Sequence, residues 1–543
     1  MLLLFSVFRA LWFETQQRQM YMALRLRYTS IPFFLLAFPV FAQIATSQYD
    51  NLRTGANLNE KILTPKNVNT RQFGKIGAWK VDGPVYAQPL YVPNLDLPDK
   101  GRHNVLYVAT EHDTVYAFDA DRPGDPPLWQ VSFLGAKRSI EPVHGDELQC
   151  PFIRPEVGIT ATPVIDMSTG TLFVLARTRV YHPVAANDYM QHLHALAITT
   201  GVEKFGGPKL IEASVSGNGA GMSGGKVNFD SLYENPRASL LLVNGNVILT
   251  WASSCDVGPY HGWVMAYDAQ TLTQKAVLNV TPDGREGGIW ASDTGPAADA
   301  SGSIFVPTGN GTFDAASGGR DYGDSLLRLD PASLAVRDYF TPFDQQKLND
   351  DDADLGSSGP TLLPDQPGPH PHLLLQPTKG GMIYVIDRDR MGKFQRGRNA
   401  IVQQIEMPDG GYGAIAYWNG HAFFVASSDY LRDYAVSNGT LKQAMRANTP
   451  HFDNPGATPA VSANGNRDAI VWVISTRTWN GRERPAVLYA YDATNIGQPI
   501  YSSEENAARD RASLATRFVV PVVVNGRVYF GTRDQVEVYG LLK

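Results

Sequence analysis

The segment QPTKGGMIYVIDR at residues 376–388 places a lysine and two glycines directly before a strand-like run. A lysine at the start of a strand is usually a solvated surface charge, and glycines beside it usually form a turn. The alternative is that Lys379 faces a ligand whose charge it neutralises. The choice between the two depends on the segments that the fold brings next to this lysine.

Other residues have the types and spacing of metal ligands. The acidic set is Asp350, Asp352 and Asp354, followed by Gly356, and the histidine pairs are His192 with His194 and His370 with His372. The acidic set resembles a calcium-binding loop, but its glycine stands one position late and no downstream acid completes it. The histidine pairs put two imidazoles on one face of a strand, as in a metal clip, although we favour plain exposure at an edge strand.

The elements that would position these residues repeat along the chain. A strand follows a small residue or proline, then come a Gly or Asn-Gly turn, a second strand, another turn and a third strand that ends in Asp. The pattern recurs roughly every 60 residues. Its equivalent positions are Pro89, Pro163, Leu241, Pro296, Pro360, Ala416, Pro459 and Pro521. Eight supersecondary units of this period predict a β-propeller.

Each unit alternates apolar residues over three strands, with a weaker fourth, so no unit can bury both of its faces alone. The last unit ends at Lys543 without an obvious outer strand, whereas residues 73–80 precede the first unit as an unpaired strand. We therefore predict an all-β fold with almost no helix. Residues 43–543 would form a single eight-bladed propeller of four-stranded antiparallel blades, closed by the N-terminal strand.

The amino terminus predicts secretion. From Met22 the chain reads MALRLRYTSIPFFLLAFPVFAQ, in which two arginines precede an apolar run that ends in small residues near Ala42. We interpret residues 1–42 as an upstream extension plus a cleaved signal peptide. The mature protein would be secreted or periplasmic and would keep no stable membrane span.

The net charge restricts the classes of partner, and the two cysteines bear on the cellular compartment. Residues 1–42 carry four arginines and one glutamate, so their removal takes the formal charge from −6 to −9. An acidic chain without a basic stripe argues against a nucleic-acid partner. Cys150 and Cys255 are the only cysteines, and in an oxidising compartment we expect them to form one disulfide. Each stands in a long connection, and both connections are expected to open onto the same face of neighbouring blades.

The repeat endings VYAFDA, VMAYDAQT and LYAYDAT resemble the pyrroloquinoline quinone (PQQ) repeats of quinoprotein alcohol dehydrogenases. Nearly the whole mature chain is similar to secreted bacterial PQQ-repeat proteins, with segments such as YDNLRTGANLNEKILTP and PEVGITATPVID. The resemblance implies an eight-bladed propeller with PQQ and Ca²⁺ in its central funnel.

The resemblance also implies site residues. Trp290 would stack under the quinone and Lys379 would reach the quinone oxygens, because a flat ring suits a planar cofactor and a cation suits its charge. Asp354 would take the proton of an alcohol and, with Asn310 and Asp256, would bind Ca²⁺. The family has glutamate where Asp256 stands, in a register that differs by one residue. The adjacent cysteine pair and the Cys-x-x-Cys-His haem motif of the family are absent.

Two functions remain open from the sequence. One is a PQQ- and Ca²⁺-dependent oxidoreductase that acts on an alcohol or sugar. The other is a non-catalytic propeller without a cofactor, which serves as a scaffold or binds a glycan, a peptide or an envelope partner. The discriminating feature is whether Trp290, Asn310, Asp354 and Lys379 converge at one end of the propeller axis.

Overall fold

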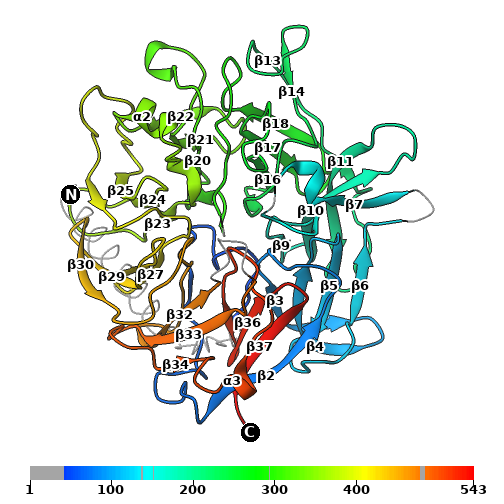
Figure 1. Ribbon diagram of the computed structural model, residues 1–543, viewed down its shortest axis with the longest axis vertical. Helices are drawn as coiled ribbons and strands as arrows, with labels where there is room; N and C mark the ends of the chain where they lie inside the picture. The colour runs from blue at the N-terminus through cyan, green and yellow to red at the C-terminus, as the bar shows by residue number, and fades with distance from the viewer. Residues whose placement is uncertain (1–41, 136–138, 151, 293, 477–482) are drawn as a thin grey trace, which may run out of the picture. The chain divides into compact units, whose positions relative to one another are not determined.

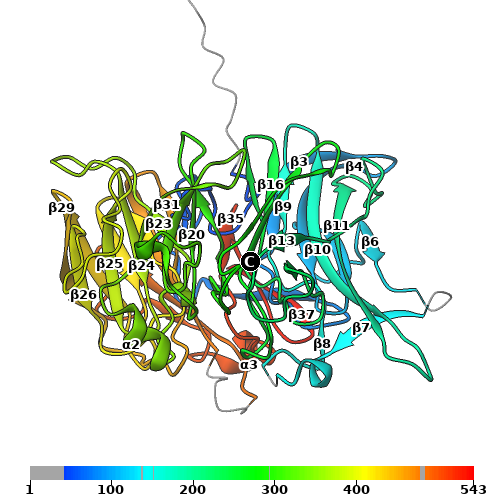
Figure 2. The same cartoon turned by 90° about the horizontal axis from the view of Figure 1, so that it is seen from above.

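A computed structural model describes residues 42–135, 139–150, 152–292, 294–476 and 483–543. The predicted upstream extension and signal peptide lie outside the described residues, except for Ala42. From Ala42 to Lys543 the chain forms one compact unit, in which eight β-sheets follow one another around a central axis (Figure 1; Figure 2). Each sheet is a blade of the predicted propeller.

Each blade has four antiparallel strands in the order of the chain, and only the last takes its outer strand from elsewhere. The innermost strands are β3 (Leu90–Leu97), β9 (Val164–Asp166), β15 (Leu241–Val243), β19 (Ala297–Ala298), β23 (Thr361–Leu362), β27 (Ala416–Trp418), β31 (Ala460–Asn464) and β35 (Val522–Val524). The second strands are β4 (Gly101–Ala109), β10 (Thr171–Val180), β16 (Asn246–Trp251), β20 (Ile304–Pro307), β24 (Leu373–Pro377), β28 (His421–Phe424), β32 (Arg467–Ser475) and β36 (Arg527–Gly531). The third strands are β5 (Thr114–Asp119), β11 (Asp188–Ala197), β17 (Trp263–Asp268), β21 (Leu326–Leu329), β25 (Met382–Asp387), β29 (Arg432–Ser437), β33 (Val487–Asp492) and β37 (Gln535–Leu541). The outer strands are β6 (Trp129–Ser132), β12 (Lys209–Leu210), β18 (Gln274–Asn279), β22 (Val336–Phe340), β26 (Gln403–Glu406), β30 (Thr440–Arg446), β34 (Tyr501–Ser502) and β2 (Phe73–Lys80).

The repeat phase and the closure of the ring are confirmed. Every innermost strand begins at the predicted repeat position or one residue after it, as Leu90 follows Pro89. Strand β2 pairs antiparallel with β37, with Phe73 opposite Leu541, and so completes the eighth blade. The first and last parts of the propeller therefore share one sheet, which closes the ring by backbone hydrogen bonds.

The remaining elements are additional to the four strands of each blade. They are β1 (Ala56–Asn57), β7 (Ile140–His144), β8 (Glu156–Val157), β13 (Ser214–Ser216), β14 (Lys226–Asn228), α2 (Gln345–Asp350), α3 (Ala507–Asp510) and three 3₁₀ turns, Gly145–Leu148, Ala315–Ser317 and Leu355–Ser357. Strands β7 and β8 extend the second blade, and β13 and β14 form a separate hairpin. Among the described residues, no helix has both the length and the apolar character needed to span a membrane.

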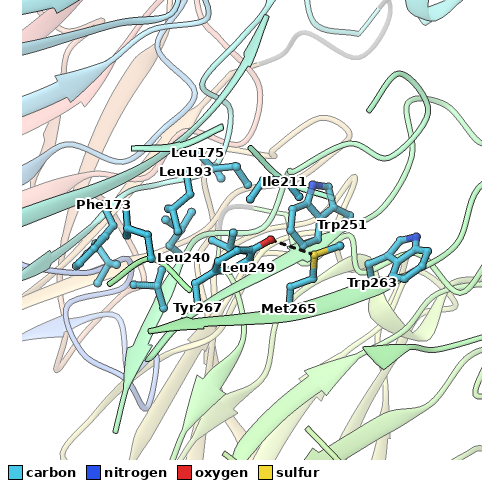
Figure 3. Close-up of a cluster of buried hydrophobic side chains, with 14 of the residues drawn as sticks. Phe173, Leu175, Leu193, Ile211, Leu240, Leu249, Trp251, Trp263, Met265 and Tyr267 are labelled. Carbon is cyan, nitrogen blue, oxygen red and sulfur yellow. Dashed lines mark hydrogen bonds between the residues drawn. The ribbon is translucent and has the colours of Figure 1, made fainter. Parts of the chain in front are cut away.

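The hydrophobic core is divided into clusters that lie between consecutive blades. Between the second and third blades, Phe173 and Leu193 from one sheet pack against Trp251, Trp263 and Met265 from the other (Figure 3). A further cluster joins the eighth blade to the first. Because side chains alternate across each sheet, every blade buries one face against its predecessor and the other against its successor.

The innermost strands are covered by the segment of residues 44–57, which we call the hub. All eight strands bond to the hub through the backbone of their second residue. In six blades the hub partner is a backbone group, whereas the third and eighth blades bond to the side chains of Asn51 and Tyr49. The second residues are Tyr91, Ile165, Leu242, Ala298, Leu362, Tyr417, Val461 and Val523. An innermost strand is a sheet edge with unpaired backbone groups, and the hub satisfies these groups in all eight blades.

Arg53 anchors the hub. Its side chain is fully buried, and its guanidinium donates to the carbonyl oxygens of Pro296 at 2.9 Å, Ser47 at 2.8 Å and Leu240 at 3.2 Å, and to Thr46 Oγ1 at 2.7 Å. Burial lowers the pKa of Arg53 to about 10, which leaves it charged at neutral pH. The planar fork of arginine can join several acceptors at once, so this residue ties the hub to the third and fourth blades.

Candidate functional site

A cavity lies at the end of the axis where the innermost strands begin. It contains about 790 Å³ of space between its atoms, open solvent at the mouth included. Asp256, Trp290, Asp354 and Lys379 line it. The hub contacts the second residue of each innermost strand, whereas these site residues belong to the connections that precede innermost strands or follow second strands.

Two kinds of connection supply the site. Trp290 and Asp354 each stand seven residues before an innermost strand, in the fourth and fifth blades. Asp256, Asn310 and Lys379 follow the second strand of the third, fourth and fifth blades. Equivalent connections of neighbouring blades open at the same end of a propeller, and for that reason residues far apart in the sequence meet here.

Lys379 lies in the tight turn between β24 and β25. Gly381 has a φ of 80°, which favours glycine, and the backbone N–H of Lys379 donates to the Asp354 carbonyl oxygen at 3.1 Å. The Lys379 Nζ lies 2.6 Å from Asp352 Oδ1 and 3.2 Å from Asp354 Oδ2. Burial lowers the pKa of Lys379, but the attraction of both carboxylates outweighs it and the net shift is upward, so the lysine is a fixed cation.

Asp354 is only 6% exposed. Its Oδ1 accepts a hydrogen bond of 2.9 Å from the backbone N–H of Asn310. Burial raises the pKa of Asp354, and Lys379 and the Asn310 N–H offset this only in part. A Cβ at Gly309 would lie 2.3 Å from Asp354 Oδ1 and 2.8 Å from Trp290 Cδ1, so only glycine fits between these two side chains.

Asn310 and Trp290 carry buried polar atoms that no described residue satisfies. Asn310 Nδ2 donates to Asp352 Oδ1 at 2.8 Å, but Asn310 Oδ1 has no hydrogen-bond partner among the described residues. The same holds for Trp290 Nε1, although its half-buried ring packs edge-on against Tyr260. Unsatisfied buried polar atoms are uncommon and point to a missing ligand or water.

Asp256 approaches the cavity from the third blade. Its Oδ1 accepts a hydrogen bond of 2.8 Å from the Tyr260 hydroxyl, and burial raises the pKa of this aspartate. The structure thus brings Asp256, Trp290, Asp354 and Lys379 into one cavity, with Asn310 bonded to Asp354 behind it. The metal-binding, cofactor-binding and catalytic roles of these residues stay predictions.

The predicted disulfide between Cys150 and Cys255 is confirmed, with Cα atoms 5.5 Å apart. It joins the insertion before the second blade to the third blade. The sequence did not reveal that both cysteines line the cavity. The chain lacks the adjacent cysteine pair of the quinoprotein alcohol dehydrogenases, but a disulfide between distant cysteines forms part of this cavity wall.

Sequence reasoning missed two arginines in the cavity wall. Arg237 Cζ lies 4.4 Å from the ring centre of Phe518, and Arg517 Cζ lies 4.2 Å from that of Phe152. Both arginines stand shortly before an innermost strand, as Trp290 and Asp354 do. The repeat alignment would have found them had every such connection been compared. Together with Lys379, they give the cavity three cationic side chains.

The other metal-binding patterns have simpler explanations. His194, His370 and His372 each bond to a carboxylate of their own blade, and Asp350 ends helix α2. The centre of the His192 ring lies 6.1 Å from that of His194, and His194 is buried, not exposed at an edge strand as expected. Within the part of the chain that the structure describes, no group of three or more His, Cys, Asp or Glu residues could hold a metal ion. A calcium site at the cavity therefore depends on the amide oxygen of Asn310 as well as on carboxylates.

No family model and no curated protein sequence matches the chain. Among solved structures, a quinohemoprotein alcohol dehydrogenase from Comamonas testosteroni is similar with a TM-score of 0.59 and 15% identity, over 92% of this chain and 80% of that chain. A europium-containing methanol dehydrogenase is similar with a TM-score of 0.59 and 14% identity, over 92% of this chain and 98% of that chain. The chain has the propeller fold of the quinoprotein alcohol dehydrogenases. At this identity the likeness to quinoproteins establishes the fold alone.

Proposed function

We propose that the protein is a PQQ- and Ca²⁺-dependent oxidoreductase that acts on an alcohol or a sugar. The observation that carries the proposal is the convergence of Trp290, Asp354 and Lys379 in one cavity, beside a buried Asn310 Oδ1 that has no partner among the described residues. The donor types and the charges at the site fit PQQ and Ca²⁺. An unpaired amide oxygen and two carboxylates suit a hard cation, and three cationic side chains suit a ligand with three carboxylates.

The residues have separate tasks in this proposal. The ring of Trp290 would support the planar cofactor, and Lys379, Arg237 and Arg517 would pair with its oxygens and carboxylates. Asn310, Asp354 and Asp256 would hold Ca²⁺, whose charge would offset the burial, and the smaller repulsion between carboxylates, that raise the pKa of both aspartates. When bound, the quinone and the metal supply an electron acceptor and a Lewis acid.

Asp354 would act as the general base for the substrate. Its Oδ1 is held by the Asn310 N–H at 2.9 Å, while Oδ2 lies 3.2 Å from Lys379 Nζ and faces the cavity wall. These contacts fix the orientation of the carboxylate, and the neighbouring cation favours its ionised form. A carboxylate so placed can accept a proton from a hydroxyl group that enters the cavity.

The disulfide supports the predicted secretion, because disulfides persist in oxidising compartments. We keep the predicted cleavage after Ala42 as part of the proposal. Sequencing the amino terminus of the protein purified from its host's periplasm or medium tests it. A first residue at Gln43 is expected, and an intact residue 1 in a cytoplasmic protein would contradict it.

Cofactor retention tests the proposal. Purified protein is incubated with PQQ and CaCl₂ and desalted, and the quinone absorbance is recorded. We expect the wild-type protein to retain PQQ, and Lys379→Ala to lose it while keeping the fold. The matched control is Lys347→Ala in α2, an exposed lysine paired with Asp351. If the wild-type protein binds neither PQQ nor Ca²⁺ at micromolar concentrations, the oxidoreductase proposal fails.

A second candidate, a non-catalytic propeller that binds an acidic glycan or peptide, is favoured by one observation. Lys379 already pairs with Asp352 and Asp354, so the site is electrostatically complete without a metal. The arginines would then recognise carboxylates of the ligand. In this case the protein would bind acidic but not neutral glycans on an array and would retain no PQQ.

A further inference from the structure

The second blade buries an arginine, Arg177, whose guanidinium forms only some of the hydrogen bonds that it could donate to described residues. Arg177, in β10, is fully buried, and its Nη2 donates to the Leu232 carbonyl oxygen. Its Nε and Nη1 have no hydrogen-bond partner among the described residues. A buried guanidinium with two unpaired nitrogens is costly, because each N–H has lost its water without gaining an acceptor.

Each of two carboxyl groups near Arg177 has one oxygen atom that accepts no hydrogen bond from a described residue. Glu111 Oε2 accepts from Gly158 N at 2.8 Å and from Thr160 Oγ1 at 3.0 Å, whereas its Oε1 has no partner among the described residues. Glu234 Oε1 accepts from Trp263 Nε1 at 2.9 Å, and its Oε2 is equally without a described partner. Both glutamates interact electrostatically with Arg177.

Unpaired donors and unpaired acceptors therefore share one buried region without contacting one another. Water satisfies both kinds of atom, and buried water typically makes about three hydrogen bonds to such groups. Burial raises the pKa of Glu111 to about 7 and raises that of Glu234 well above its ordinary value. Burial therefore favours the neutral form of Glu234, and a neutral carboxylic acid can both give and take a proton.

The region continues to the ligand cavity. Asn235, which follows Glu234, is 2% exposed, and its Oδ1 has no partner among the described residues. Ser253 is fully buried, and its Oγ is likewise without a described partner. Both side chains line the cavity. The unsatisfied atoms thus extend from the cavity wall through Glu234 and Arg177 to Glu111.

We propose that internal water molecules bridge Arg177 to Glu111 and Glu234 and continue to Asn235 and Ser253, forming a proton path from the ligand cavity into the second blade. The path goes beyond the proposed function and does not depend on it. In a dehydrogenase it would carry the proton released by the substrate to Glu111, a buried carboxyl group that can accept it.

A high-resolution crystal structure tests the first part of this proposal. We expect ordered water within hydrogen-bond distance of Arg177 Nε and of Glu234 Oε2. Direct contact of the Arg177 guanidinium with either glutamate, or a region without water density, would overturn it. Neither outcome depends on whether a cofactor binds.

Infrared spectroscopy tests the path itself. The band of a protonated carboxyl group should disappear in Glu234→Gln, which assigns it to Glu234. After transfer of the wild-type protein to D₂O, this band should shift rapidly, as water carries deuterons inward. Asn235→Leu should slow the shift at least tenfold, and Ser253→Val is the second variant if Asn235→Leu does not fold. The control is Asn218→Leu, an exposed asparagine outside the path. A missing band, or equal rates in all variants, would refute the path.

Discussion

The two ends of the propeller axis use the same repeat in different ways. At the hub end, the second residues of all eight innermost strands bond to one segment, and Arg53 finds four acceptors. At the cavity end, buried polar atoms of Asn310 and Trp290 find no partner among the described residues, and Asp354 is buried beside a lysine. The hub finds most of its partners within the chain, although Ser47 Oγ has none among the described residues, whereas the cavity end retains capacity for a ligand. The residues that stabilise the ring are therefore different from the residues that can bind a ligand.

The largest expected effect is at the hub end. Arg53→Met removes the donors of three carbonyl oxygens and a hydroxyl, and each unpaired buried acceptor costs about 1–3 kcal/mol. We expect the free energy of unfolding in urea to fall by at least about 3 kcal/mol. Arg122→Met, at an exposed arginine, should change it by less than about 0.5 kcal/mol. A loss at Arg53 no larger than this control would show that the hub does not stabilise the ring.

The next effect concerns the covalent link at the cavity end. Replacing Cys150 and Cys255 together with serine should lower the free energy of unfolding by about 2–4 kcal/mol, because the bond closes a long loop. The measurement is urea unfolding of both proteins with and without a reducing thiol. The thiol should destabilise only the wild-type protein. Equal stabilities without thiol would mean that the cavity wall holds without this bond.

A smaller effect would sharpen the contrast between the two ends. Trp290→Phe removes an Nε1 that has no described partner and keeps an aromatic ring in the cavity. We expect the free energy of unfolding to change by less than about 1 kcal/mol, while PQQ retention weakens. Thermal unfolding and the desalting assay measure the two quantities. A severe loss of stability would place Trp290 in the packed core and would weaken its assignment to a ligand.

The smallest effect is a pH dependence in the sixth blade, where His421 of β28 pairs with Asp433 of β29. The hydrogen bond to Asp433 raises the pKa of His421, and burial opposes this only in part. A raised folded-state pKa adds stability that is fully present below the unfolded-state pKa of about 6.5 and is lost as the pH rises through the folded value. His421→Gln should therefore flatten the stability profile between mildly acidic and neutral pH. An unchanged profile would mean that Asp433 does not pair with a charged imidazole.

The sequence predicted what depends on local patterns. The prolines before the inner strands set the repeat phase to within one residue. The missing outer strand of the last unit, together with an unpaired strand at residues 73–80, predicted the closing strand. The hub was not predicted, because it contacts eight strands that are remote in sequence and leave no shared pattern in residues 44–57. Arg237 and Arg517 were missed for a similar reason, since a single arginine in a connection carries no signal until the ring brings it to the axis.

The central claim is that Asp354 accepts a substrate proton in a cavity that holds PQQ. The most direct test is the reduction of an artificial electron acceptor by protein reconstituted with PQQ and Ca²⁺, over a panel of alcohols and sugars, for the wild type and Asp354→Asn. We predict turnover by the wild type and a loss of at least about 100-fold in Asp354→Asn, with PQQ still retained. Wild-type protein that retains PQQ without turnover, or an Asp354→Asn variant as active as the wild type, would contradict this account.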